Sequence, residues 1–441
     1  MELRPGYKKT DVGVIPDDWH VLTLREVLLS NEVGGNYPNS TAPSLFPLMK
    51  MGNVSRGHFD LSKIEFVSSG IVPHKNHLLQ KGDVIFNTRN TLDLVGKIAV
   101  WREEIPIAYF NSNLMRLQFD PTKISSHEYA NLTLNTDTTL SGLRAMATGT
   151  TSVAAIYTRD LLGLPIIVPP RSEQKAIAES LSDVDASIAA LSRLIAKKRD
   201  LRRGAMQRLL TGRTRLPGFS APWQEKRLGD HVAFLKNGIQ SRAQLTLDDP
   251  VRYLHYGDIH VSADLSLDLR KTAMPRLPSL AAAGLTRLKD GDVVFVDASE
   301  DLNGVGKSLE ILGANGIEAV SGQHTIAARF DKSVLADGYK CYLQFTPSFT
   351  THLRRLAAGT KVYATNRQHI ASAELRLPEP DEQIAIAQVF SDMETEISVL
   401  ETRLDKTRAL KQAMMQALLT GRVRLPVPRD AASQMKEAAH A

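Results

Sequence analysis

Two segments of the chain carry apolar residues that recur at alternating steps of four and three positions. This is heptad spacing, which is typical of a helix that pairs with another helix along a narrow apolar seam. The seam positions are Ile177, Leu181, Val184, Ile188, Leu191 and Ile195 in the first segment, and Ile386, Phe390, Met393, Ile397, Leu400 and Leu404 in the second. The pattern therefore predicts two long helices of the coiled-coil type.

Both predicted helices carry start and stop signals at matching places. Ser172 and Asp381 follow or adjoin prolines and are good N-cap residues. Gly212 and Gly421 suit the left-handed position just past a helix end. Each helix is therefore expected to have a defined beginning and a defined end.

The two helical segments are copies of each other. The run from Glu173-Gln174 to Arg215-Leu216-Pro217 returns without a gap as the run from Glu382-Gln383 to Arg424-Leu425-Pro426, at a constant offset of 209 residues (382 − 173). Chance does not produce such a match, so the chain contains an internal duplication.

A helix of about 40 residues spans roughly 60 Å and needs a partner for its apolar stripe. The other copy is the obvious partner. The second globular region starts just after the first helix and finishes just before the second, so both joints lie at one end and the helices should run antiparallel. Packing of each helix on its own globular region, or on another subunit, is the alternative.

The regions around the helices, about 1–170 and 216–379, are weakly similar to each other. Gly82-Asp83-Val84-Ile85-Phe86 matches Gly291-Asp292-Val293-Val294-Phe295, and Trp19 answers to Trp223. Short runs rich in strand-forming residues and punctuated by Gly, Asn and Pro indicate strand-rich modules. The predicted fold class is α+β, with two mixed α/β domains separated by two antiparallel helices in a pseudo-two-fold, circular repeat.

Composition narrows the classes of protein without selecting one. A length of 441 residues suits two to four domains, and the single cysteine, Cys341, excludes a disulfide framework and a thiolate zinc cluster. The start does not resemble a signal peptide and no apolar stretch approaches 18 residues, so we expect a cytoplasmic protein. A formal charge of +6 permits binding to a polyanion but does not require it.

A search for catalytic motifs finds no phosphate-binding loop, dinucleotide fingerprint, nucleophile elbow or HExxH helix. Glu173-Gln174-Lys175 has the acid-x-Lys spacing of some nucleases, but its copy reads Glu382-Gln383-Ile384, so helix capping is the better explanation. His74 and His77 have no further ligand nearby and are expected to lie in a solvated loop. The sequence therefore predicts no catalytic residues and no metal site.

The loops that differ most between the two halves carry side chains able to read DNA. Arg and Asn form paired hydrogen bonds to base edges, and small hydroxyl residues around glycine let the backbone approach phosphate. For each single residue an ordinary solvated loop is the alternative, and for Lys307 a tight turn before a strand. The candidates in the first region are Asn87, Arg89, Asn90, Arg144, Thr148, Gly149, Thr150 and Thr151. Those in the second are Ser299, Asn303, Lys307, Arg354, Gly359, Thr360, Lys361, Tyr363 and Asn366.

Taken together, these features resemble the specificity (S) subunits of type I restriction-modification systems, over nearly the whole chain. The resemblance is carried by the opening from Tyr7 to Trp19, the helix entries at 169–174 and 378–383, the two Leu-Leu-Thr-Gly-Arg exits, and the paired Gly-Asp-hydrophobic-hydrophobic-Phe runs. The duplicated set in this order is specific to that family.

The resemblance implies a DNA-recognition subunit that is not itself an enzyme. Its expected domains are a first target recognition domain (1–170), a central spacer helix (171–213), a second recognition domain (214–379), a C-terminal spacer helix (380–422) and a flexible tail (423–441). The partners implied are double-stranded DNA with a bipartite asymmetric site, two modification (methyltransferase) subunits and restriction (motor-nuclease) subunits. No cofactor is expected on this chain; S-adenosylmethionine, ATP and Mg²⁺ belong to the partners.

Two other functions remain open at this point. A coiled-coil scaffold without DNA recognition would also need the paired helices, and a stand-alone DNA-modifying enzyme would need a catalytic site of a kind that the motif search does not recognise.

Overall fold

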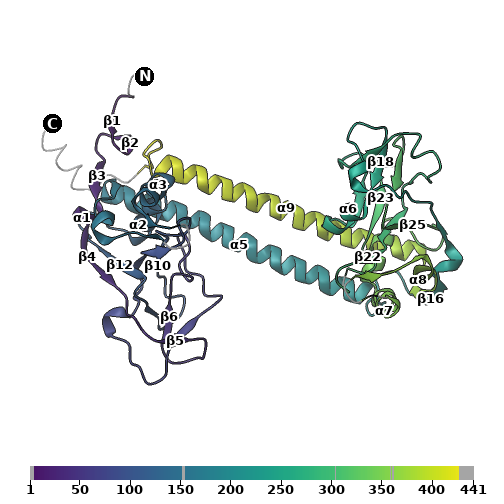
Figure 1. Ribbon diagram of the computed structural model, residues 1–441, viewed down its shortest axis with the longest axis horizontal. Coiled ribbons are helices and arrows are strands. Elements are labelled where there is room, and N and C mark those ends of the chain that lie inside the picture. Colours follow the sequence, from purple (N-terminus) through teal and green to yellow (C-terminus); the bar gives the residue numbers. More distant parts are fainter. Residues whose placement is uncertain (1–3, 151–153, 303, 358, 360–361, 427–441) are drawn as a thin grey trace. The chain divides into compact units, whose positions relative to one another are not determined.

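The computed structural model describes residues 4–150, 154–302, 304–357, 359 and 362–426. Its chain divides into two compact units, one made of Met1–Ser192 with Arg403–Ala441 and the other of Arg193–Thr402. Figure 1 shows both, with the sequence coloured from purple to yellow. Each unit therefore holds one strand-rich region together with part of each long helix.

The first unit is built on a four-stranded antiparallel sheet with the order β10-β8-β12-β4. Its strands are β4 (Leu28–Val33), β8 (Val84–Asn87), β10 (Ile98–Val100) and β12 (Leu114–Phe119). A second sheet has the order β11-β6-β7-β5. Its strands are β5 (Asn39–Ser40), β6 (Pro47–Met49), β7 (Glu65–Val67) and β11 (Tyr109–Phe110).

Smaller elements complete this unit. The strands are β1 (Tyr7–Thr10) with β2 (Gly13–Pro16), β3 (His20–Thr23) with β15 (Pro165–Val168), and the trio β9 (Arg89–Asn90), β13 (Thr148–Gly149) and β14 (Ala154–Ala155). The helices are α1 (Leu24–Val27), η1 (Lys75–His77), α2 (His127–Leu134), α3 (Asp137–Met146) and α4 (Thr158–Leu161).

The second unit repeats this plan. Its main sheet has the order β17-β25-β21-β23-β19, and a smaller one the order β20-β18-β24. The strands are β16 (Gln224–Arg227), β17 (Val232–Phe234), β18 (Val251–Leu254), β19 (Ser266–Asp268), β20 (Arg276–Leu277), β21 (Val293–Val296), β22 (Ala298–Ser299), β23 (Ser308–Leu312), β24 (Ala319–Ser321), β25 (Thr325–Phe330), β26 (Tyr363–Ala364) and β27 (Glu374–Leu377). The helices are η2 (Leu228–His231), η3 (Arg242–Gln244), α6 (Tyr256–Val261), η4 (Lys340–Phe345), α7 (Pro347–Leu356) and α8 (Arg367–Ala371).

The strand orders of the two units correspond. The run β10-β8-β12-β4 matches β23-β21-β25-β17, and β11-β6-β7 matches β24-β18-β20, with a parallel first pair and an antiparallel second pair in both. The paired Gly-Asp-hydrophobic runs lead into β8 and β21, and every residue of these two strands is buried. The expected mixed α/β architecture with a long helix pair is confirmed.

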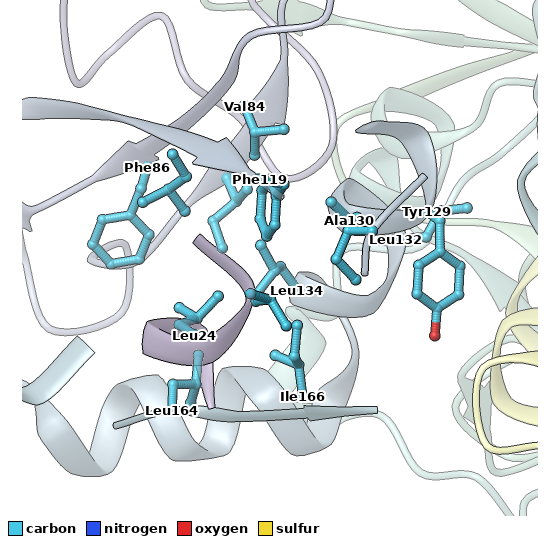
Figure 2. Close-up of a cluster of buried hydrophobic side chains, with 14 of the residues drawn as sticks. Leu24, Val84, Phe86, Phe119, Tyr129, Ala130, Leu132, Leu134, Leu164 and Ile166 are labelled. Atoms are coloured by element: carbon cyan, nitrogen blue, oxygen red, sulfur yellow. The ribbon is translucent and has the colours of Figure 1, made fainter. Parts of the chain in front are cut away.

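The hydrophobic core of the first unit lies between its main sheet and the segments that join it to the helices. Figure 2 shows Leu24, Leu164 and Ile166 packed with Leu134 and Phe119. Each fully buried side chain of this kind stabilises the fold by about 1.5–3 kcal/mol. The same core includes Ile177 and Leu181 from one long helix and Leu418 and Leu419 from the end of the other.

The long helices are α5 (Arg171–Leu209) and α9 (Pro380–Leu418), and both are 39 residues long. All twelve predicted seam residues are buried or half-buried. In the second unit, Leu209 and Leu210 from the end of α5 and Ile386 and Phe390 from α9 enter the core of the globular region. The seam therefore continues directly into the core of each unit, so that pairing and packing on the globular region occur together.

Ion pairs give the direction of the helix pair within each unit. Lys198 contacts Glu396 at 2.6 Å, and Arg202, one turn later, contacts the earlier residue Glu394. In the first unit Lys411 contacts Asp185 at 2.6 Å. Since the partner's number falls as the residue number rises, the helices run antiparallel, as predicted.

The predicted N-caps are wrong. The amide of Gln174 donates to the carbonyl of Pro170 at 3.0 Å, and that of Gln383 to the carbonyl of Glu379 at 3.1 Å. Pro170 and Glu379 are therefore the capping positions, and the polar side chains after them lie inside the helices. The predicted ends are confirmed, because Gly212 and Gly421 adopt the left-handed conformation with φ of 67° and 71°.

Candidate nucleic-acid interface

In the first unit, two loops that are far apart in sequence join in one small sheet. Strand β14 pairs with β9 on one side, opposing Arg89 and Asn90, and with β13 on the other, opposing Thr148 and Gly149. Arg89, Thr148 and Gly149 are exposed, and Asn90 is half-buried. The structure therefore places these four predicted DNA-contacting residues on a common three-stranded platform.

Asn87 lies beneath this platform rather than on it. Its side chain is fully buried at the end of β8, and its Oδ1 accepts a hydrogen bond from the amide of Arg89 at 3.2 Å. Its Nδ2 has no hydrogen-bond partner among the described residues. In this structure Asn87 therefore stabilises the turn that leads into β9. The sequence analysis had predicted Asn87 as a DNA-contacting residue, and its polarity alone did not reveal this structural role.

In the second unit, the described residues form a related sheet of two strands. Strand β22 pairs with β26, which sets Ser299 opposite Tyr363. Ser299 is buried, and its hydroxyl accepts from the amide of Asp301 at 3.3 Å, whereas Tyr363 is half-buried. Asn366 is exposed and caps α8 by accepting from the amide of His369 at 2.9 Å.

The ammonium group of Lys307 is engaged in hydrogen bonds within the protein. Its ammonium group donates to the carbonyls of His260 at 2.6 Å and Ser262 at 2.9 Å. The preceding residue, Gly306, has φ of 82°, and an added Cβ there would meet the Leu353 side chain at 2.6 Å. The geometry is that of a tight turn before a strand, the alternative that the sequence left open, and the lysine braces a neighbouring loop.

The remaining candidates lie at the ends of helices or beyond the described residues. Arg144 and Arg354 are exposed in the last turns of α3 and α7, and Thr150 and Gly359 are also exposed. Thr151, Asn303, Thr360 and Lys361 lie outside the residues that the structure describes. Their predicted role in DNA binding stays a prediction.

The sequence analysis did not predict the buried carboxylate that lies at the start of each long helix. The Glu173 carboxylate accepts from the indole of Trp19 at 3.0 Å and from the Arg424 guanidinium at 2.6 and 2.7 Å. Arg424 also contacts both oxygens of Asp18 at 2.9 Å. These hydrogen bonds to Arg424 hold the pKa of the Asp18 carboxyl below its usual value.

The same constellation stands in the second unit. The Glu382 carboxylate accepts from the Arg215 guanidinium at 2.5 and 2.6 Å and from the Trp223 indole at 3.2 Å. Both glutamates are 1% exposed. We call each group an Arg–Glu–Trp junction. It shows that the capping interpretation of Glu173 was wrong, because the carboxylate joins three distant segments instead of binding helix amides.

The glutamine after each glutamate adds a further identical contact set. The Gln174 amide donates to the carbonyls of Lys123 and Pro169, and its oxygen accepts from the amide of Ser125. The Gln383 amide donates to the carbonyls of Val334 and Pro378, and its oxygen accepts from the amide of Ala336. Fully buried polar side chains need hydrogen-bond partners, and both glutamines have them. In the sequence, the identity of the Glu-Gln pair in both copies is a sign of this shared structural role.

Comparison with known proteins agrees with this geometry. Residues 16–197 match the family model described as the type I restriction modification DNA specificity domain. This segment of the chain is similar to the DNA specificity domain of type I restriction-modification systems. The resemblance seen in the sequence is thereby confirmed, and with it the predicted function of a DNA-specificity subunit.

Curated relatives match along almost the entire chain. A protein described as a candidate MjaX type I restriction enzyme specificity subunit from Methanocaldococcus jannaschii is 22% identical over 95% of this chain and 97% of its own. The MjaVIII specificity subunit of the same organism is 20% identical over 93% and 94%. The StySPI specificity subunit of Salmonella potsdam is 23% identical over 93% and 90%.

Solved structures share the fold. The S subunit of a type I system from M. genitalium has a TM-score of 0.54 at 13% identity, covering 95% of this chain and 98% of that one. The HsdS subunit from Thermoanaerobacter tengcongensis has a TM-score of 0.51 at 17% identity, covering 93% and 98%. A chain from a study of type I complex assembly and conformational transition has a TM-score of 0.58 at 17% identity, covering 93% and 99%.

Among the described residues, no helix has the length and apolar character to cross a membrane, and no group of three or more His, Cys, Asp or Glu side chains is arranged to hold a metal ion.

Proposed function

We propose that this DNA-specificity subunit reads a bipartite, asymmetric site, with residues 1–170 recognising one half and residues 214–379 the other. The observation that carries the proposal is the pair of equivalent small sheets. Arg89, Asn90 and Thr148 lie on one sheet, and Tyr363, opposite the buried Ser299, lies on the other. A shared frame that presents different polar side chains suits two half-sites of different sequence.

The helices at 171–213 and 380–422 are proposed to form an antiparallel coiled coil that sets the distance between the half-sites. Support comes from ion pairs at positions related by the 209-residue offset. Asp185 pairs with Lys411, and the corresponding Glu394 pairs with Arg202, so both copies keep the charges while the residue types differ. The glutamates and arginines of the two Arg–Glu–Trp junctions are related by the same offset (382 − 173 and 424 − 215), whereas Trp19 and Trp223 are 204 residues apart (223 − 19). This supports a pseudo-two-fold, circular repeat that ends in the tail at 423–441.

The chemistry is proposed to belong to partner subunits. Two modification subunits docked on the helix pair would supply S-adenosylmethionine and methylate adenine, and restriction subunits would supply ATP-driven translocation and Mg²⁺-dependent cleavage. One solved structure with this fold comes from a study of complex assembly in a type I system. In this proposal the chain itself binds DNA, determines the site and catalyses nothing.

A domain exchange tests the proposal. Residues 1–170 would be replaced by the corresponding region of another specificity subunit, and the complex with its modification subunit would be assayed by mapping methylated adenines across a genome. We expect one half of the methylated site to change while the other half and the gap stay the same. Methylation at an unchanged site would contradict the assignment, and methyl transfer by the isolated chain would contradict the non-catalytic role.

A further inference from the structure

A cavity of about 510 Å³, lined mostly by residues of polar or charged type, lies within the first unit, between the segment after β6, helix α2 and the parts of α5 and α9 that belong to this unit. Four of its lining residues form two ion pairs, Arg102 with Glu128 and Lys411 with Asp185. The Arg102 guanidinium contacts both oxygens of Glu128 at 2.8 and 2.6 Å, and Lys411 reaches Asp185 at 2.6 Å.

Arg56 also lines this cavity, and it belongs to neither of these two ion pairs. Its Nη1 is buried and has no hydrogen-bond partner among the described residues. Its Nη2 makes one long contact, of 3.5 Å, to the carbonyl of Asp93. No ion pair to a carboxylate is recorded for Arg56 within the described part of the chain, so the cavity holds a positive charge that the protein does not balance.

A like charge approaches Arg56 instead of an opposite one. Burial, and in second place the positive charge of Arg144, lower the pKa of the Arg56 guanidinium. Arg144 is exposed at the end of α3 and belongs to the residues predicted to contact DNA. Two cations held near each other are costly unless an anion lies between or beside them.

The location suggests which anion this is. Asp93, whose carbonyl Arg56 contacts, lies three residues after Asn90 at the end of β9. Strand β9 belongs to the platform that carries Arg89, Thr148 and Gly149. A guanidinium with free N–H groups in a fixed fork is the protein group best suited to a phosphate oxyanion.

We propose that Arg56 forms a phosphate-binding site that holds a backbone phosphate of the DNA bound by the first recognition region. The proposal rests on the function proposed above and adds a residue that no sequence motif marked. Phosphate contacts fix the register of a protein on the duplex and carry no base information. Arg56 is therefore a positioning residue for the bases read by the platform.

The position of the second unit that corresponds to Arg56 in the sequence match carries no arginine. The match of Met51-Gly52-Asn53-Val54 with Tyr256-Gly257-Asp258-Ile259 sets Val261 opposite Arg56. Val261 is 84% exposed and carries no charge. The phosphate contact should accordingly occur in the first half-site alone. Such a contact would favour one orientation of the pseudo-symmetric subunit on its DNA site.

The test uses the complex with its modification subunit and measures DNA affinity as a function of salt concentration. Each phosphate neutralised contributes a slope of about −0.9 in log K against log salt. For Arg56→Gln we expect the slope to shrink by about one contact, with affinity lower by on the order of tenfold, equally for specific and unrelated DNA. Arg102→Gln is the matched control: it changes an arginine in the same cavity whose charge Glu128 already balances, and the slope should stay unchanged.

The outcomes separate the site from the proposed function. An unchanged slope for Arg56→Gln in a complex that binds DNA, or an equal loss for Arg102→Gln, would overturn the site. If the wild-type complex shows no salt-dependent DNA binding, the proposed function fails, and inorganic phosphate becomes the probe. Phosphate that raises the thermal unfolding midpoint of the wild type but not of Arg56→Gln would then show a free-phosphate site and refute the DNA source, and no effect on either would refute the site itself.

Discussion

The Glu173 carboxylate shows what a single side chain contributes in this protein. It is almost completely buried, and it accepts hydrogen bonds from Trp19 near the start of the chain and from Arg424 near the end of the described residues. A carboxylate removed from water is stable only when its oxygens are bonded and its charge is paired. The residue therefore ties three segments of the first unit together.

Replacing Arg424 by an apolar residue should therefore destabilise the first unit. We expect Arg424→Leu to lower the free energy of unfolding of the first unit by about 2–3 kcal/mol, because Glu173 would keep its buried charge without a partner. Chemical denaturation of the purified protein, followed by tryptophan fluorescence, would report the loss. The exposed neighbour Arg422 offers the control, and Arg422→Leu should change stability by less than about 0.5 kcal/mol.

A double variant tests whether the unpaired Glu173 carboxylate causes this loss of stability. Replacing Glu173 by Gln together with Arg424→Leu removes both charges, so the double variant should be more stable than Arg424→Leu alone. A double variant that is as unstable as the sum of both single ones would contradict the view that the unpaired carboxylate is the cause.

The long helices combine two kinds of contact along one face. Their ends enter the cores of the globular regions, and their middle parts carry buried and half-buried apolar residues and cross-helix ion pairs. Such a seam is stabilised mainly by apolar burial, since exposed ion pairs contribute about 0–1 kcal/mol each. A charge introduced at an apolar seam position in the middle of the helix pair should consequently weaken helix pairing without entering either core.

Charge in the middle of the seam should separate assembly from folding. We expect Ile188→Glu or Leu400→Glu to abolish formation of the complex with the modification subunits, while each globular region keeps its structure. Size-exclusion chromatography with the partner and circular dichroism of the isolated chain would measure the two effects. Ala189→Glu, on the exposed face next to Ile188, is the control and should leave assembly intact. Unfolding of the whole chain by Ile188→Glu would show that the globular regions depend on the helix pair.

At the scale of the whole molecule, the division of labour follows from duplication. The helices and their junctions keep the same contacts in both copies, whereas the small sheets carry different polar residues. Similarity between copies therefore marks shared geometry, and the proposed function assigns recognition to the residues that differ. A specificity subunit built in this way could change its target by exchange of one region without any change to the frame.

Lengthening both helices should test the helix pair as a spacer. Insertion of one or two heptads into α5 and the same number into α9 preserves the seam, so the complex should still form. We expect the methylated site to keep both half-sites and to gain base pairs between them, as measured by mapping methylated adenines. A change in the bases of either half-site would contradict the assignment of spacing to the helices and of reading to the globular regions.

Local pattern was enough for the long helices and for the duplication. Heptad spacing, the paired glycines and the constant offset depend on residues within a few turns of each other, so Ile177 to Ile195 and Ile386 to Leu404 could be identified as one face without any tertiary information. The antiparallel direction also followed, because the positions of the connections allow no other arrangement with short joints. The helix starts were misjudged because polarity near a proline does not reveal which carbonyl accepts the first bond.

Only the tertiary structure decided which distant residues meet. Nothing in the sequence near Trp19, Glu173 or Arg424 indicates that they share one buried hydrogen-bond network, and the platform of β9, β13 and β14 joins segments more than 50 residues apart. The unbalanced charge of Arg56 is likewise invisible until Arg102 and Lys411 are seen to have partners. Periodicity records the local geometry of a chain, whereas burial and charge balance are properties of the folded neighbourhood, which long-range packing alone creates.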